Sequence, residues 1–226
     1  MTDASRPTVL FDIDGTLTDT TYLQVQAWRR AFLDHGLDVA SAAIHRHIGM
    51  GASMLMEDLV GEARQDVKDA WRRHFDELKP EIRALAGAKE LLVEVAGRGG
   101  QVVLATSSEP DDVEALLAAI SANDAIDVVT SAGDVDEAKP SPEVFQVALQ
   151  QAGAQASSAV VVGDTPWDVA AARRADLGCV GVRSGGISAA ELEEAGALAV
   201  YEDPADLLEH LDDSPLGQLL AQGRLR

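Results

Sequence analysis

The sequence predicts an α/β fold with a helical segment inserted after the first strand. Three observations support this prediction. From residue 87 onward, short apolar runs typical of buried strands alternate with helical patterns, whereas residues 20–79 show helical periodicity throughout. The chain has 226 residues, 46% of them hydrophobic, which is enough to bury a sizeable core.

The first strand is expected at residues 8–11, an apolar run that ends at Asp12. Apolar residues then recur every three to four positions, so that a first helix is expected from about residue 20 to Gly36. Further helices are expected at 41–48, 53–60 and 62–79, and Pro80 ends the last of them.

After Gly87 the strand and helix patterns alternate regularly. Strands are expected at 101–105, 126–129, 159–162, 179–182 and 198–201, and helices at 89–97, 111–120, 142–151, 166–175, 188–195 and 204–211. This order predicts a Rossmann-like parallel sheet with helices on both faces. We expect an α/β core from residues 1–17 and 86–226 and an α-helical cap domain from residues 18–85.

The composition excludes several classes of partner and environment. Lys and Arg number 18 and Asp and Glu 38, a net charge of −20, which disfavours nucleic acid and anionic membranes as partners. We find no apolar run near the ~18 residues of a membrane helix and no signal-peptide pattern at the N-terminus. The single cysteine, Cys179, excludes an internal disulfide. We therefore expect a soluble, cytoplasmic protein.

Reactive side chains follow several of the expected strands. Asp12 and Asp14 come after the first strand, Thr106 after the next, and Asp164 after the strand at 159–162, while Lys139 precedes a helix. Ligands bind outside the carboxyl ends of the strands in an open parallel sheet. These groups are therefore expected to meet at one edge of the sheet.

The spacing of the first two aspartates favours a metal site. Residues i and i+2 of an extended chain point the same way, so Asp12 and Asp14 can face one site, and Gly15 permits a sharp turn after them. Carboxylates held together repel unless a cation or a proton intervenes. With Asp164 as a third carboxylate, the oxygen ligands suit Mg²⁺.

These segments resemble the four motifs of the haloacid dehalogenase-like hydrolase superfamily. The matching residues are Asp12-Ile-Asp14-Gly15-Thr16, then Thr106-Ser107, then Lys139-Pro140, and then Gly163-Asp164-Thr165-Pro166-Trp167-Asp168. A helical cap between the first and second motifs is similar to the branch of phosphoglycolate phosphatases and β-phosphoglucomutases. The resemblance covers nearly the whole chain.

The resemblance implies a role for each core residue. Asp12 would be the nucleophile that forms an aspartyl phosphate, and Asp14 the general acid and base. Mg²⁺ would be held by Asp12, Asp164 and the Asp14 carbonyl. Thr106 would donate a hydrogen bond to phosphate, and Lys139 would pair with both phosphate and Asp12.

Other residues keep two interpretations. Gly15 and Ser107 are candidates for contacting the substrate. The next residue, Ser108, has the spacing of a helix cap. Asp168 is either a group behind the metal ligands or the third residue of a capping box that starts at Thr165. Arg46, in the glycine-flanked segment 46–53, is a candidate for holding a substrate carboxylate or second phosphate, or is part of a simple helix–helix turn.

The family contains several chemistries. Asp14 favours phosphate transfer over dehalogenation and over phosphonate cleavage, because relatives with those activities lack this second aspartate. Gln24 stands where the mutases have a histidine, which favours a phosphatase, with a β-phosphoglucomutase-like mutase as the alternative. A phospho-accepting signalling protein or a phosphate-binding protein is the alternative of another class. The expected partner is a small phosphorylated metabolite of the phosphoglycolate or sugar-phosphate type, and the chain is expected to be a monomer or homodimer.

Overall fold

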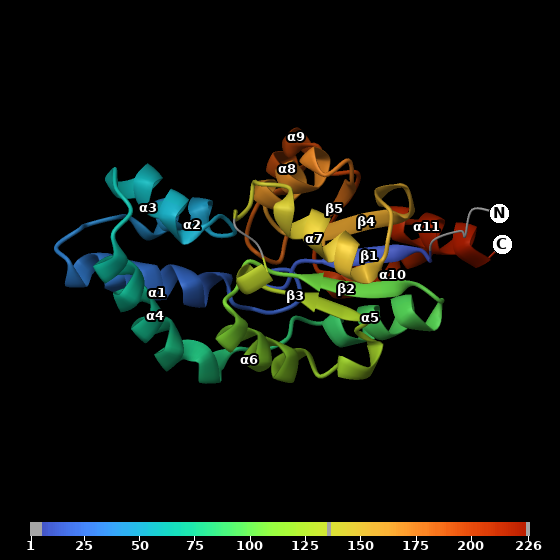
Figure 1. The fold of residues 1–226 in the computed structure, drawn as a ribbon, viewed down its shortest axis with the longest axis horizontal. Coiled ribbons are helices and arrows are strands. Elements are labelled where there is room, and N and C mark those ends of the chain that lie inside the picture. The colour runs from blue at the N-terminus through green and yellow to red at the C-terminus, as the bar shows by residue number, and fades with distance from the viewer. Residues whose placement is uncertain (1–5, 135–136, 225–226) are drawn as a thin grey trace.

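Within the residues that the structure describes, the sheet has six strands and is parallel throughout. The structure, a computed structural model, describes residues 6–134 and 137–224, and its strand order is β3-β2-β1-β4-β5-β6 (Figure 1). The strands are β1 (Thr8–Phe11), β2 (Gln101–Ala105), β3 (Val128–Thr130), β4 (Ala159–Gly163), β5 (Gly178–Val182) and β6 (Val200–Tyr201). In register, Val9 lies beside Val102 on one side and beside Val160 on the other. The predicted α/β class is confirmed.

Helices cover both faces of this sheet. Alternate residues of β1 point to opposite faces, so that Leu10 packs in one hydrophobic cluster while Val9 and Phe11 pack in the other. The cluster around Leu10 includes residues of α7 (Glu143–Ala152), α8 (Pro166–Arg174) and α9 (Ala189–Ala195). The opposite cluster includes residues of α5 (Ala88–Gly97), α6 (Pro110–Ile120), α10 (Pro204–Glu209) and α11 (Pro215–Arg224).

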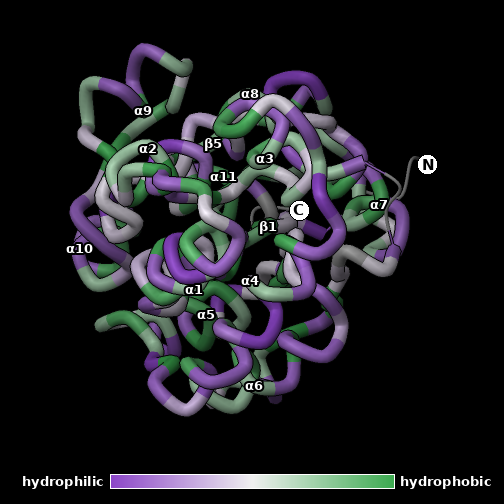
Figure 2. The backbone as a smooth tube through the Cα atoms, turned by 90° about the vertical axis from the view of Figure 1, so that its left-hand side faces the viewer, coloured by the Kyte–Doolittle hydropathy of each residue, from purple (hydrophilic) through white to green (hydrophobic). Residues whose placement is uncertain are grey.

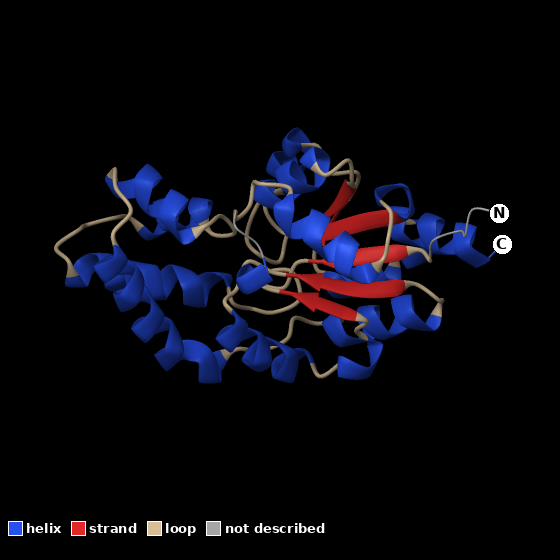
Figure 3. Cartoon of the chain, in the orientation of Figure 1, coloured by secondary structure: helices blue, strands red, loops and turns tan. Residues whose placement is uncertain are grey.

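The helices between β1 and α5 lie at one end of the sheet. They are α1 (Thr21–Asp34), α2 (Ser41–His47), α3 (Ala52–Val60) and α4 (Gln65–Leu78), and we call them the cap. In Figure 3 the arrowheads of β2 and β3 point toward the cap, and both labelled termini lie at the opposite end of the molecule. The reactive strand ends therefore face the cap.

Each long helix has one apolar face. Hydrophobic and hydrophilic residues alternate along the tube at α1, α4 and α6 (Figure 2), the pattern of helices that bury one side. In the cap, Trp28 of α1 stacks on Trp71 of α4 with ring centroids 5.1 Å apart. This aromatic contact joins the two long cap helices.

The element boundaries differ from the predictions at a few places. β3 begins at Val128, two residues later than expected, and α11 occupies a tail for which the sequence patterns predicted no element. The division into a core (1–17, 86–226) and a cap domain (18–85) stays a prediction, and residues 1–5, 135, 136, 225 and 226 of that core lie outside the described part. No helix within the described ranges has the length and apolarity to cross a membrane.

Candidate active site

The loops after β1 and β4 place two carboxylates side by side. Asp12 follows β1 directly, and its backbone N–H donates to Val162 O at 2.9 Å, so it is held against β4. Thr16 donates to Asp164 Oδ1 at 3.0 Å and lies 3.4 Å from Asp12 Oδ2. Gly15 has φ +79°, and a Cβ there would lie 2.4 Å from Asp164 Oδ2, so the turn needs glycine.

Lys139 lies between two buried aspartates. Its Nζ donates to Asp12 Oδ1 and is 2.7 Å from Asp168 Oδ1. Lys139 is 1% exposed, so these charges are paired away from water. The predicted pairing of Lys139 with Asp12 is present in the structure, and Asp168 is an additional partner.

Asp168 is the third residue of the capping box and also contacts Lys139, while its role behind the metal ligands stays a prediction. Its Oδ2 accepts from the Thr165 backbone N–H at 3.1 Å, and its own N–H donates to Thr165 Oγ1 at 3.2 Å, which completes the capping box of α8. Its other carboxylate oxygen faces Lys139. The helix cap therefore orients a carboxylate that fixes the lysine.

Asp12, Asp164 and Asp168 form an acidic cluster whose ligand atoms lie within 4.8 Å of one another. Asp164 Oδ2 is buried and has no hydrogen-bond partner among the described residues. A Cβ at Gly185 would lie 1.7 Å from this oxygen, so the backbone closes tightly around it. A buried carboxylate oxygen without a partner, next to further carboxylates, fits a divalent cation.

Burial and neighbouring charges shift the pKa values of the cluster. Burial raises the pKa of Asp12 to about 7, with further increases from Asp168 and Asp14, while Lys139 acts in the opposite direction. Burial and the charges of Asp168 and Asp12 also raise the pKa of Asp164. Burial lowers the pKa of Lys139, but the charges of Asp12 and Asp168 outweigh it, so its pKa lies above the usual value. The site therefore favours added positive charge.

The Asp14 carboxylate lies apart from the acidic cluster. Its Oδ1 accepts from Thr20 Oγ1 at 2.7 Å, and its Oδ2 accepts from Ser108 Oγ. The sequence interpretation of Ser108 as a helix cap is wrong. Glu109 stands at the N-cap position of α6, and the Ser108 hydroxyl donates to Asp14 instead. The sequence does not reveal the contact of Ser108 with Asp14, because this contact depends on β1 and β2 being neighbours in the sheet.

The segment after β2 faces the same space. The Thr106 hydroxyl accepts from the Ser108 backbone N–H at 2.9 Å. The Ser107 hydroxyl oxygen is buried and has no partner in the described part of the chain. Thr106, Ser107 and Ser108 all line a cavity of about 920 Å³ together with Asp12, Asp14 and Lys139.

The cap supplies the other wall of this cavity. Its lining residues are mostly apolar or uncharged and include Gln24, Trp28, Ile48, Met50, Leu55 and Trp71. The cavity thus joins the reactive strand ends to a largely uncharged cap surface.

Comparison with known proteins agrees with this geometry. The family model described as haloacid dehalogenase-like hydrolase matches residues 9–182, which include all four motifs. The chain is a haloacid dehalogenase-like hydrolase.

Its relatives include named phosphatases. The hydrolase is 32% identical to validoxylamine A 7'-phosphate phosphatase from Streptomyces hygroscopicus subsp. limoneus over 76% of this chain and 84% of that protein. It is 32% identical to phosphoglycolate phosphatase from Rhodospirillum rubrum over 88% of each chain. The crystal structure of a hydrolase from Pseudomonas syringae is similar with a TM-score of 0.87 and 36% identity, covering 92% of this chain and 99% of that one.

The structure does not bring Arg46 into the cavity of this hydrolase. Arg46 lies on α2, and its guanidinium pairs with Glu191 of α9, which is also the third residue of the capping box of that helix. The Arg46 side chain is 59% exposed. The expectation that Arg46 holds an anionic group of the substrate is therefore corrected, because its charge is used at the surface between cap and core.

Substituting Arg46 by alanine is expected to change little. An exposed ion pair contributes roughly 0–1 kcal/mol to stability, so the free energy of unfolding should fall by less than about 1 kcal/mol, and kcat/KM should stay within about threefold. Glu191→Ala should destabilise more, by about 0.5–2 kcal/mol, because it also removes part of a helix cap. Denaturant titration and steady-state kinetics check this. A tenfold rise in KM for Arg46→Ala would mean that Arg46 does contact the substrate.

Proposed function

We propose that this hydrolase is a Mg²⁺-dependent phosphatase that acts on a small phosphorylated metabolite through an aspartyl phosphate on Asp12. The proposal depends mainly on Asp12, which lines the cavity and contacts the ammonium of Lys139. Asp12 also belongs to the same acidic cluster as Asp164, whose Oδ2 has no partner among the described residues. Hydrolysis of a phosphoric monoester agrees with the family and with its phosphatase-named relatives. The metal, the intermediate and the substrate are parts of the proposal.

Asp12 carries the phosphoryl group in this scheme. One carboxylate oxygen of Asp12 bonds to phosphorus, and the bond from phosphorus to the ester oxygen breaks. The Asp14 carboxyl gives its proton to the leaving oxygen. Asp14 then takes a proton from a water molecule that attacks phosphorus, which restores Asp12 and releases inorganic phosphate.

The other residues position and neutralise the phosphoryl group. Thr20 and Ser108 hold Asp14 from both carboxylate oxygens, which keeps it oriented for proton transfer. Lys139 and the hydroxyls of Thr106 and Ser107 supply donors at the cavity floor. Asp12 and Asp164, with the Asp14 carbonyl, would hold Mg²⁺, which adds positive charge beside the phosphate.

Gln24 favours water as the phosphoryl acceptor. Its amide lines the cavity on the cap side and does not exchange a proton at neutral pH, unlike a histidine. Asp14 could take the proton of a water molecule or of a sugar hydroxyl, so the preference for water depends on Gln24, which stands where the mutases have a histidine. Nucleic acid and membranes are not expected as partners of a chain with charge −20, and a monomer or homodimer in the cytoplasm stays a prediction.

Metal removal tests the proposal. Phosphate release from a panel of phosphomonoesters should stop in excess chelator and return with Mg²⁺, and Ca²⁺ should inhibit because its looser coordination disturbs the in-line geometry. Circular dichroism in chelator should show a folded chain. Full activity in excess chelator would contradict the proposed metal dependence.

A further inference from the structure

We infer that the cavity selects phosphomonoesters whose leaving group carries no second negative charge, and that the ion pair of Lys68 with Glu109 maintains this selection. The inference rests on the proposed phosphatase function and specifies its substrate class. It follows from how the charges that line the cavity are paired.

The lysines of the cavity wall are already paired with carboxylates. Among the described residues, the lining cations are Lys68, Lys139 and Arg174. Lys139 contacts Asp12 and Asp168 at the floor. On the cap side, Lys68 of α4 lies 3.3 Å from Glu109 Oε1. On the core side, Arg174 of α8 donates one N–H to the neutral backbone oxygen of Pro140 at 2.6 Å. A carboxylate or second phosphate that approached Lys68 would compete with Glu109 for its ammonium.

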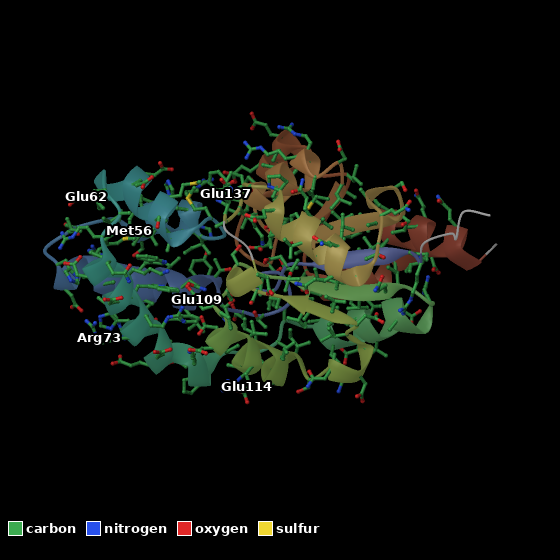
Figure 4. The ribbon with its side chains drawn as sticks, viewed as in Figure 1. Met56, Glu62, Arg73, Glu109, Glu114 and Glu137 are labelled. Atoms are coloured by element: carbon green, nitrogen blue, oxygen red, sulfur yellow. The ribbon has the colours of Figure 1, made fainter. Side chains whose placement is uncertain are left out.

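The remaining charges of the wall are negative. Apart from Asp12 and Asp14, the lining carboxylates of the described residues are Glu57, Glu109, Asp112 and Glu137. Asp112 is compensated by Arg72 and by Lys79, both held against it from the α4 side of the cap. Glu57 and Glu137 are exposed at the cavity, and Figure 4 labels Glu109 and Glu137 between the cap helices and the sheet. A second anion there meets like charge.

The uncharged part of the wall suits a ring or a hydroxylated carbon chain. Trp28 and Trp71 stack on each other, and Gln24 adds an amide that can donate or accept hydrogen bonds. A cavity of about 920 Å³ also leaves room for a leaving group much larger than two carbons. The uncharged lining residues and the volume of the cavity therefore also favour a leaving group without a second negative charge.

The test compares esters that differ in one carboxylate. Glucitol 6-phosphate and 6-phosphogluconate have the same length and differ by a hydroxymethyl or a carboxylate at the far end; glycerol 3-phosphate and 3-phosphoglycerate form a shorter pair. We expect kcat/KM to be at least about tenfold higher for the neutral member. Glu109→Gln removes one negative charge and frees Lys68, so this ratio should fall to about threefold or less.

The matched control is Glu114→Gln. Glu114 lies on α6, five residues after Glu109, and is exposed outside the cavity (Figure 4). It changes the net charge by the same amount and should leave the ratio as in the wild-type enzyme. Because both esters are measured on each variant, partial unfolding lowers both rates and leaves the ratio unchanged.

Each outcome separates the inference from the proposed function. Equal rates on both members, a preference for the carboxylate, or an undiminished ratio in Glu109→Gln would overturn the inference and leave the phosphatase intact. Hydrolysis of p-nitrophenyl phosphate without hydrolysis of either neutral ester would also overturn it. No phosphate release from any ester with Mg²⁺ would overturn the proposed function and the inference with it.

Discussion

Asp12→Asn is expected to abolish turnover while the fold is kept. An amide does not form the acyl phosphate, so kcat should fall by at least about 10⁴-fold, as for loss of a covalent nucleophile. Burial raises the pKa of Asp12 to about 7, and Lys139 keeps its contact with Asp168 when Asp12 becomes an amide, so the melting temperature should change little. Phosphate release and thermal unfolding measure the two effects separately.

Asp19→Asn is the matched control for this variant. Asp19 is exposed and lies only seven residues after Asp12, outside the acidic cluster. Its substitution should leave kcat within about twofold and stability within about 0.5 kcal/mol. If Asp12→Asn kept more than ~1% of the wild-type turnover, Asp12 would not be the nucleophile.

Lys139→Met is expected to have the second largest effect, on both stability and activity. Removing one member of a buried ion pair leaves uncompensated charge, which costs about 3–5 kcal/mol of unfolding free energy. Asp12 and Asp168 would both lose the ammonium that now lies between them. Catalysis should fall by about 10²–10³-fold, because a preorganised positive group beside the phosphate is lost. Urea titration in chelator and single-turnover assays check the two expectations.

A second substitution separates charge from packing in this result. Adding Asp168→Asn to Lys139→Met removes one of the two stranded carboxylates and should recover at least about 1 kcal/mol. Lys89→Met replaces an exposed lysine of α5 and should cost less than about 0.5 kcal/mol. No recovery in the double variant would mean that the loss comes from the packing of the Lys139 side chain.

Most of the fold could be predicted because the sequence patterns of its strands and helices are local. The apolar run at residues 8–11 and the alternation after Gly87 are visible within a few residues, and the strands form where they were expected to within about two residues. Asp12 and Asp164 could be placed together because parallel strands end at one edge of a sheet. The tail helix was missed although Leu216, Leu219 and Leu220 have helical spacing, because the pattern is short and contains two glycines, which disfavour a helix.

The sequence by itself determined the strand-end residues and the family motifs; the tertiary structure decided what their neighbours do. Ser108 reaches Asp14 across 94 residues, and Arg46 reaches Glu191 across 145. The sequence around Ser108 has the spacing of a helix cap, and Arg46 is flanked by glycines, whether or not a distant partner is present. Local spacing therefore does not reveal these contacts. The direction of a side chain is set by the packing of distant elements, so the partner of Asp14, the surface position of Arg46 and the charges of the cavity wall emerged only once the cap lay against the sheet.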